Sequence, residues 1–473
     1  MNLLFVSLSD LHLGEEDSLL TNLAIGKPEP EPQAPAPCLI ALINYLHAIK
    51  RWVNEGRPIP FLVLNGDVLE LALADYASAV AVLRGFLFEL AKRRICEKIV
   101  YVPGNHDHAL WSLIRDTAFM QSMSRQQEIP KRPAVDHVTR LSVPRQTEVL
   151  GLISSNFPLQ VQPLPVSVAN PALRLTSWNG HDYFFHHGHL MEEMYTLMSL
   201  LSDRIMSDMP LEELRKLPLT DNLADLEREN WPWIDFFWSG FSRAGRVGQT
   251  VESLYELLSK PEGVKKLVER LSGILRTELD IPIIPEGFED DCLRYVLKKS
   301  LHGGGVGSQE RADASRSPLN ERIATSVDRF LTHYLKRELA DEGQRLSADR
   351  SAFVFGHTHK PFLDALRDTP GGLKKIDLIN SGGWVVESEE SRPGYGPGVV
   401  LGTNQGETAL VTFQLDVEAG SEVRQTGSWD VTLAKVQERD ELARAVSEAV
   451  RVRREHFRQR VTRASRLLES LDT

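Results

Sequence analysis

The chain has 473 residues, of which 42% are hydrophobic and 25% are charged, and its formal net charge is −11. This composition is that of a soluble globular protein, and the length suggests about three structural units. The acidic balance argues against a protein that coats nucleic acid non-specifically, although it leaves a local basic surface open.

The cysteines and the first residues bear on the compartment. Cys38, Cys96 and Cys292 are odd in number, far apart and without CxxC spacing, which argues against a disulfide framework and a thiolate zinc site. The apolar run at the start is too short for a signal peptide, and no window approaches the roughly 20 apolar residues that a spanning helix needs. We therefore expect a cytoplasmic protein without a transmembrane segment.

Three short apolar runs near the start each end in a polar cluster. NLLFVSL ends in SDLH, PFLVLN ends in GDVLE, and KIVYV ends in PGNHD. Helical spacing of apolar residues fills the intervening segments 38–55 and 74–94. The alternation of strands and helices predicts an α/β sheet that is buried on both faces. In such sheets ligands bind beyond the carboxyl ends of the strands, where all three clusters fall.

The rest of the chain changes character twice. The Pro-rich segment 27–37 is a loop, and LRLTSWNGHDYFFHHGHL predicts two strands joined at Asn179 and Gly180. From about 190 to 346 the pattern is largely helical, with a flexible break at 303–308. Further strands are then expected at 351–355, at 374–380 and across 398–414. A charged helix is expected at 430–470.

Polar clusters with oxygen and nitrogen donors follow five of the predicted strands. They contain Asp10 and His12; Asp67; Asn105, His106 and Asp107; His186, His187 and His189; and His357 and His359. Taken alone, Asp-x-His and Gly-Asp are better explained as ordinary turns, and GNHD and GHTH fit a solvated turn or a site about equally, but the ordered set favours a metal site. Donors without sulfur suit Mn, Fe, Co, Ni or Zn. The candidates outnumber the ligands of one ion, which indicates two metals sharing a carboxylate.

The order DxH, GD, GNHD, HGH, GHTH resembles the calcineurin-like metallophosphoesterases over roughly residues 1–190 and 350–415. The resemblance implies an α/β fold, a two-sheet sandwich flanked by helices, with a dinuclear centre at the strand ends. The remaining parts would be a large, mainly helical insertion at 191–349 and a C-terminal helical extension at 416–473.

The resemblance also implies the ligands of two divalent ions, with manganese favoured and Fe, Zn, Co or Ni also compatible. One ion would be held by Asp10, His12 and His359, the other by Asn105, His187 and His357, and Asp67 would bridge them. At FHHGH the family's spacing favours His187, whereas His186 should point to the opposite face of its strand. His189 is the less favoured substitute.

The implied reaction is hydrolysis of a phosphoester by a hydroxide that bridges the two metals. His106 would lie beside the phosphate as a catalytic group, and Asp107 would fix its ring. NGDVLEL and LINSGGWV resemble the UDP-2,3-diacylglucosamine hydrolase-like branch, which favours a phosphodiester or pyrophosphate. However, the chain carries some 155 extra residues between HGH and GHTH.

Two further segments bear on partners. NWPWIDFFWSGF at 230–241 fits a helix packed in the core, a lipid or peripheral membrane contact, or a base-stacking or protein surface. VRVRREHFRQRVTRASR at 450–466 carries seven arginines and one glutamate. This pattern fits a solvated helix face or a surface for nucleic-acid phosphates. A nuclease, or a scaffold without catalysis, therefore stays an alternative.

Overall fold

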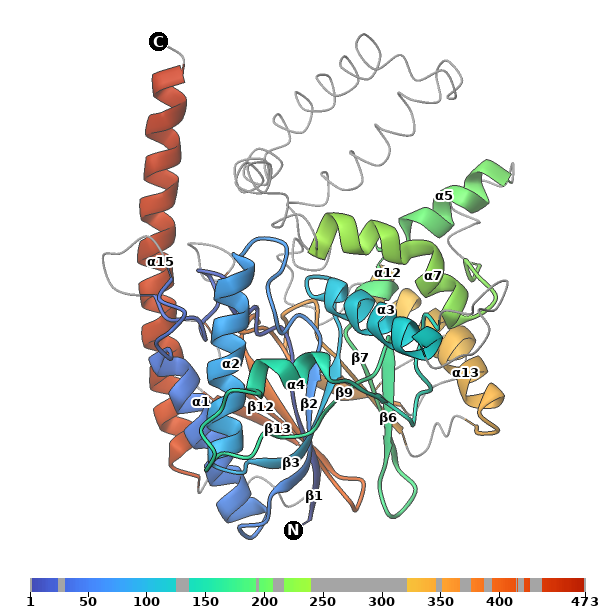
Figure 1. The fold of residues 1–473 in the computed structure, drawn as a ribbon, viewed down its shortest axis with the longest axis horizontal. Coiled ribbons are helices and arrows are strands. Elements are labelled where there is room, and N and C mark those ends of the chain that lie inside the picture. The colour runs from blue at the N-terminus through green and yellow to red at the C-terminus, as the bar shows by residue number, and fades with distance from the viewer. Residues whose placement is uncertain are drawn as a thin grey trace.

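The chain forms two β-sheets with helices outside them (Figure 1). The computed structural model describes residues 2–23, 30–124, 136–192, 195–206, 217–239, 321–345, 351–365, 376–386, 394–413, 415, 421–425 and 436–471. Within these residues the predicted α/β sandwich is confirmed. No helix in the described ranges combines the length and apolar character needed to cross a membrane.

The larger sheet has the order β13-β12-β11-β1-β2-β3-β5-β4. Its strands are β1 (Leu3–Leu8), β2 (Ile59–Asn65), β3 (Cys96–Val102), β4 (Arg145–Gln146), β5 (Val166–Val168), β11 (Gly398–Thr403), β12 (Thr408–Phe413) and β13 (Ser421–Gln425). β1, β2, β3 and β5 run parallel, so the polar clusters after β1, β2 and β3 meet at one edge. β13 continues this sheet past residue 415, into the segment 416–473 that we expected to be a helical extension.

The smaller sheet has the order β6-β7-β8-β10-β9. Its strands are β6 (Ala172–Thr176), β7 (Asp182–His186), β8 (Ser351–Phe355), β9 (Phe362–Ala365) and β10 (Asp377–Asn380). β6 and β7 form the predicted hairpin, and Gly180 at its turn has a φ of 79°. β7 and β8 are parallel neighbours, so the chain leaves the sheet at the carboxyl end of β7 and returns at the amino end of β8, and the carboxyl ends of both strands lie at one edge.

The inner faces of the two sheets pack through apolar side chains. Phe5 of the larger sheet meets Tyr183 and Phe185 of the smaller one edge to face, at centroid distances of 4.8 and 4.9 Å. All three side chains are buried, and aromatic pairs in this arrangement add to the gain from burial. This contact holds the carboxyl ends of β1 and β7 at the same edge of the sandwich.

Helices cover both outer faces. The described helical segments are α1 (Pro37–Ala48), η1 (Ile49–Val53), α2 (Tyr76–Lys92), α3 (His108–Ser124), α4 (Val149–Ser154), η2 (His189–Met191), α5 (Leu197–Met206), α7 (Leu223–Ile234), η3 (Asp235–Ser239), α12 (Glu321–Arg329), η5 (Phe330–Leu335), α13 (Lys336–Asp341) and α15 (Glu438–Leu471). α1, α2 and α15 share a core with the outer face of the larger sheet (Figure 1). α7 and η5 pack on the smaller sheet. The expected break at 303–308 lies outside the described residues.

The C-terminal helix α15 is joined to the sandwich through Arg453. This side chain is buried, and its Nε and Nη2 donate to the Ser18 carbonyl at 3.0 and 2.6 Å, while Nη2 also donates to the Thr21 carbonyl. Arg454 donates to the Leu415 carbonyl at 2.9 Å. Part of the arginine-rich pattern is therefore used inside the protein, next to the loop that follows β1.

Replacing Arg453 with Met is expected to destabilise the protein by about 2 kcal/mol, because buried carbonyl oxygens lose charged donors. Arg451→Met is the matched control, since Arg451 is exposed and contacts Glu448 on the same helix. We expect no measurable change for it. Urea unfolding of both variants measures the difference, and equal stability of the two would contradict the structural role of Arg453.

Candidate metal centre

The ends of five strands bring the predicted ligands together in strained backbone. Asp10, His12, Asp67, His357 and His359 have φ values of 53°, 44°, 48°, 68° and 58°. Residues with a Cβ seldom adopt this left-handed region, and strain of this kind concentrates at functional sites. All five residues lie in the loops that follow β1, β2 and β8.

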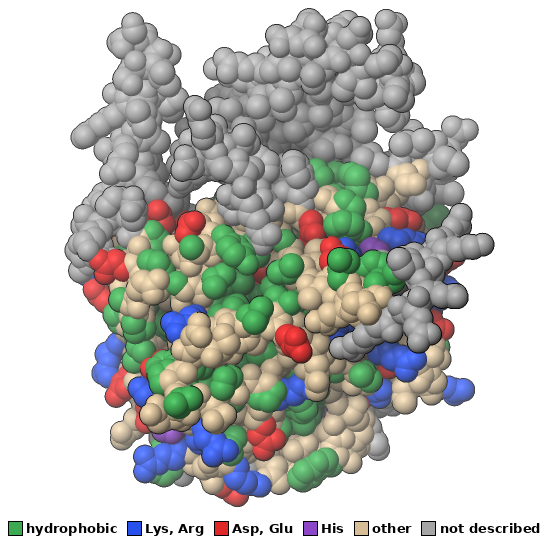
Figure 2. Space-filling view, in the orientation of Figure 1, with side chains coloured by type: hydrophobic (Ala, Val, Ile, Leu, Met, Phe, Trp, Pro, Cys, Tyr) green, Lys and Arg blue, Asp and Glu red, His purple; other side chains and the backbone are tan. Residues whose placement is uncertain are grey.

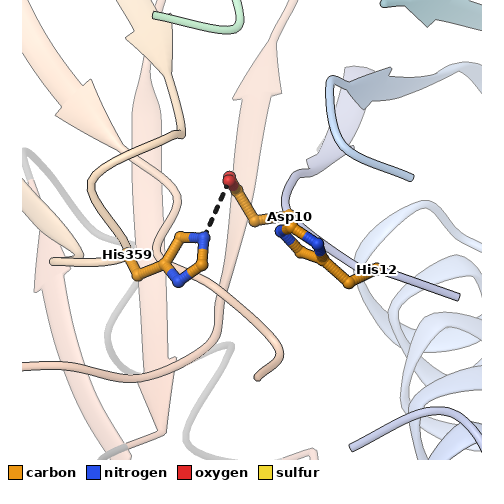
Figure 3. A group of neighbouring side chains, drawn as sticks. All are labelled: Asp10, His12 and His359. Carbon is orange, nitrogen blue, oxygen red and sulfur yellow. Dashed lines mark hydrogen bonds and ion pairs between the residues drawn. The ribbon is translucent and has the colours of Figure 1, made fainter. Parts of the chain in front are cut away.

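A first group consists of Asp10, His12 and His359, all buried (Figure 3). The Nε2 atom of His359 lies 3.0 Å from Oδ1 of Asp10. The carboxylate of Asp10 also accepts the backbone N–H of His357. A Cβ on Gly356 would lie 2.1 Å from Oδ2 of Asp10, so only glycine lets the GHTH loop approach this carboxylate. The group joins the loops after β1 and β8.

A second group consists of Asp67, His187 and His357, with Asn105 beside it. Nε2 of His187 lies 3.0 Å from Oδ2 of Asp67, 3.1 Å from Oδ1 of Asn105 and 3.2 Å from Nδ1 of His357. Burial disfavours the charged form of His187, but the carboxylates of Asp67 and Asp10 raise its pKa to about 9. The donor atoms of Asp67, Asn105 and His357 thus all lie within 3.2 Å of Nε2 of His187.

Asp67 connects the two groups. Its Oδ2 faces His187 at 3.0 Å and His12 Nε2 at 3.8 Å, and its Oδ1 accepts the backbone N–H of His106 at 2.8 Å. A Cβ on Gly104 would lie 2.1 Å from Oδ1, which explains the glycine of GNHD. Asp67 thus has one oxygen held by the loop after β3 and the other directed between the groups.

The donor set fits divalent cations. Carboxylate, amide and imidazole donors without sulfur match borderline ions, and every one of these side chains is buried. Among the described residues, the buried Nε2 of His12 has no hydrogen-bond partner. Gathered buried carboxylates are costly unless positive charge compensates them. Bound cations would supply that charge.

The ring of His106 lies beside this centre, and its partner is Glu70 rather than Asp107. Nδ1 of His106 is 2.7 Å from Oε2 of Glu70, which is also 2.8 Å from Nδ1 of His12. Asp107 instead accepts backbone N–H groups of Val68 and Gly104, at 2.7 and 2.6 Å, and the Tyr101 hydroxyl. The expectation that Asp107 fixes the ring is thus replaced by a role in holding the loops of Asp67 and Asn105 together.

Comparison with known proteins decides the family. The model of the calcineurin-like phosphoesterases matches residues 3–260, more than half of the chain. The chain belongs to this family. It is therefore a metallophosphoesterase, a hydrolase of phosphoester bonds that uses divalent metal ions. The chain is also similar to a dimetal phosphatase from Danio rerio, with 11% identity and a TM-score of 0.31, over 90% of this chain and 100% of that one. No curated protein sequence matches the chain.

Glu70 is a residue of this phosphoesterase that our reading of the sequence did not assign to the site. It lies three residues after Asp67, in NGDVLEL, and its Oε1 also accepts the backbone N–H groups of Ala72 and Leu73 at 2.7 and 2.9 Å. Burial opposes ionisation of Glu70, but His106 and His12 lower its pKa to about 2. The signal in the sequence was an acidic residue on the same loop as Asp67.

Glu70→Gln is expected to weaken metal affinity and lower the turnover of the phosphoesterase, each by about 10- to 100-fold, because the carboxylate orients two imidazole rings. Metal titration and kcat on a chromogenic phosphoester would measure the two effects. Glu89→Gln on α2 serves as the control, since its carboxylate contacts only Arg93 and Lys92 among the described ion pairs. Full activity and metal affinity in Glu70→Gln would contradict this role.

The other two histidines of FHHGH are also buried in the phosphoesterase. The ring of His186 packs against Phe330 and Phe353, at centroid distances of 4.5 and 6.5 Å, which confirms that it faces away from the centre. His189 lies 5.5 Å from His187 between ring centroids. Neither ring nitrogen of His189 has a hydrogen-bond partner among the described residues.

The described part of segment 230–241 packs into the protein. Trp238 is buried in the cluster that covers the smaller sheet, and Trp231 lies under Arg115 at 4.6 Å from the guanidinium carbon to the ring centroid. Trp233 packs partly buried against the same cluster. The side chains of Phe236 and Phe237, and all of Phe241, lie outside the described residues. The core interpretation thus holds for Trp238, whereas Trp231 and Trp233 are half-buried.

Proposed function

We propose that the centre holds two divalent ions and hydrolyses a phosphodiester or a pyrophosphate. One ion would be bound by Asp10, His12 and His359, the other by Asn105, His187 and His357, with Asp67 between them. The observation that carries this proposal is the convergence of buried donors on Asp67 Oδ2, which lies 3.0 Å from His187 and 3.8 Å from His12. The donor chemistry is compatible with Mn, Fe, Co, Ni or Zn, and the family resemblance favours manganese among them.

Two bound dications would lower the pKa of a water toward neutrality, so that hydroxide attacks phosphorus, and would neutralise the phosphate oxygens. Side chains of the protein would orient one another and hold the proton that this reaction needs. Glu70 holds Nδ1 of His106, which leaves Nε2 to donate to the phosphate or to the leaving oxygen. Asp107 supports this arrangement indirectly, through the backbone on both sides of the centre.

The preference for a phosphodiester or pyrophosphate rests on two segments beside the centre. NGDVLEL carries Asp67 and Glu70. LINSGGWV reaches the first metal group, where the backbone N–H of Trp384 donates to the backbone carbonyl of Asp10 at 2.9 Å. Both segments resemble the UDP-2,3-diacylglucosamine hydrolase-like branch, whose members cleave a pyrophosphate. We extend the type of reaction to this chain and leave its natural substrate open.

The test is the purified chain with Mn²⁺, assayed on bis-p-nitrophenyl phosphate, p-nitrophenyl phosphate and single-stranded DNA. We expect the diester to be hydrolysed with a higher kcat/KM than the monoester, and activity to disappear with a chelator and return with Mn²⁺. Faster turnover of the monoester would overturn the diester preference. Absence of turnover in a folded, metal-loaded sample would favour the scaffold alternative.

Fast DNA cleavage that weakens steeply with salt would favour the nuclease alternative. Nothing observed on the described surface favours it over the diesterase. On the face in Figure 2, the described Lys and Arg side chains are scattered among acidic and apolar ones, and Arg453 is buried in the core. Nucleic-acid contact, lipid contact and a cytoplasmic location therefore stay predictions from the sequence.

A further inference from the structure

Part of the insertion is attached directly to the GNHD loop. η3 packs against α3, the helix that follows this loop (Figure 1). The Ser239 hydroxyl at the end of η3 donates to the backbone carbonyl of Asn105 at 2.6 Å. Both groups are buried. The backbone of a proposed metal ligand is therefore hydrogen-bonded to the insertion.

A buried ion bridge makes the second attachment. His108, at the start of α3, has Nδ1 2.5 Å from Oδ1 of Asp235 and Nε2 2.8 Å from Oε1 of Glu227. The Ser112 hydroxyl donates to the other oxygen of Asp235 at 2.5 Å. Burial opposes protonation of His108, but Glu227 and Asp235 raise its pKa to about 10. The charged ring thus ties α7 and η3 to α3.

These attachments place Trp238 beside the centre. Its ring centroid lies 6.3 Å from that of His106 and 5.1 Å from that of Tyr195, whose ring is in turn 5.0 Å from that of His357. Trp238 and Tyr195 together form an aromatic wall that runs from His106 to His357. The wall adjoins the residue proposed to face the leaving group and a ligand of the second ion.

The burial of Trp238 indicates how this wall acts. Only 2% of the residue is exposed, so the indole has no free face on which a base or ring of the substrate could stack. A large, closely packed side chain at this position instead limits the volume beside His106. Its anchors on Asn105 and His108 oppose a displacement that would make room.

We propose that Trp238 is a specificity-determining residue that limits the size of the leaving group accepted beside His106. This inference rests on the proposed function, because it takes His106 as the group nearest the leaving oxygen. The substrates selected by this wall are phosphoesters with a slender leaving group, and bulky fused-ring leaving groups are excluded. The insertion would thereby set specificity through a fixed wall attached to the catalytic loop.

The test compares leaving groups of similar chemistry and different width: the p-nitrophenyl and 4-methylumbelliferyl esters, as mono- and diesters. In Trp238→Ala the ratio of kcat/KM for the wider over the narrower ester should rise about tenfold. Trp231→Ala is the matched control, because this tryptophan lies on α7 and stacks on Arg115. We expect that ratio to stay within about twofold of wild type.

Metal content and melting temperature are measured for each variant, and Trp238→Leu is carried in parallel in case the alanine variant does not fold. A ratio unchanged in both Trp238 variants, or changed equally in Trp231→Ala, would overturn the specificity role. A uniform fall for all esters would indicate a structural role only and would also overturn it. Wild-type protein that binds metal yet hydrolyses none of the esters would count against the proposed function itself.

Discussion

Asp67→Asn is expected to abolish metal binding and hydrolysis together. Asp67 lies between the two groups of donors, with Oδ2 at 3.0 Å from His187 and 3.8 Å from His12, so the neutral amide removes the charge that both ions would share. Loss of the metals removes several kcal/mol of transition-state stabilisation, which corresponds to a fall in kcat/KM of about 10³-fold or more. Elemental analysis of the purified variant and its rate on bis-p-nitrophenyl phosphate measure the two effects.

Asp116→Asn is the control, because the Asp116 side chain on α3 is exposed and its described ion pair is with Arg115. This variant should retain the metal content and rate of the wild type. If Asp67→Asn kept two ions per chain, the bridging position would be wrong. If it lost the ions and kept its activity, metal-dependent catalysis at this site would be wrong.

His106→Ala is expected to show the opposite combination, with both metals retained and kcat reduced by about 10²- to 10⁴-fold. The ring contacts Glu70 at 2.7 Å and is not among the proposed ligands, so its removal leaves both metal groups complete. The reduction is that of a lost general acid or charge-stabilising group. Steady-state kinetics with Mn²⁺, combined with a metal titration, separate the two effects.

Added imidazole should restore part of the lost rate in His106→Ala, and His47→Ala on α1 should behave as the wild type. Loss of metal from His106→Ala would show that the ring is a ligand and would change the assignment. An unaltered kcat would place the proton donor elsewhere.

The polar residues predicted to follow the strands lie together in the structure, and the reason is local. Apolar runs followed by GD, GNHD or GHTH encode a buried strand and then a turn, and parallel neighbours bring such turns to one edge. Glu70 escaped this reasoning because its neighbours in NGDVLEL are apolar and its partners, His12 and His106, come from other loops. Asp107 was given a ring partner because the two residues are adjacent in sequence, whereas its carboxylate turns toward the backbone of Val68 and Gly104.

The bridge from His108 to Glu227 and Asp235 could not be found from the sequence either. The partners are separated by |i−j| of 119 and 127, and no spacing rule links a helix start to a helix so far along the chain. The same holds for Arg453, whose pattern fits a solvated helix until α15 is seen against the loop of Ser18. Whether a charged residue is solvated or buried depends on the packing of distant elements.

By itself, the sequence determined the alternation of strands and helices and the polar donors at the strand ends, because strand periodicity and the polar residues that end each strand are local properties of the chain. The two-sheet sandwich was implied by the family resemblance. Only the tertiary structure decided which side chains orient those donors and where the tryptophans of the insertion lie. Those contacts join residues from different loops and helices, 36 and 58 positions apart for Glu70 with His106 and His12 and 134 apart for Ser239 with Asn105, and their free energy exists only once the sheets and helices have packed.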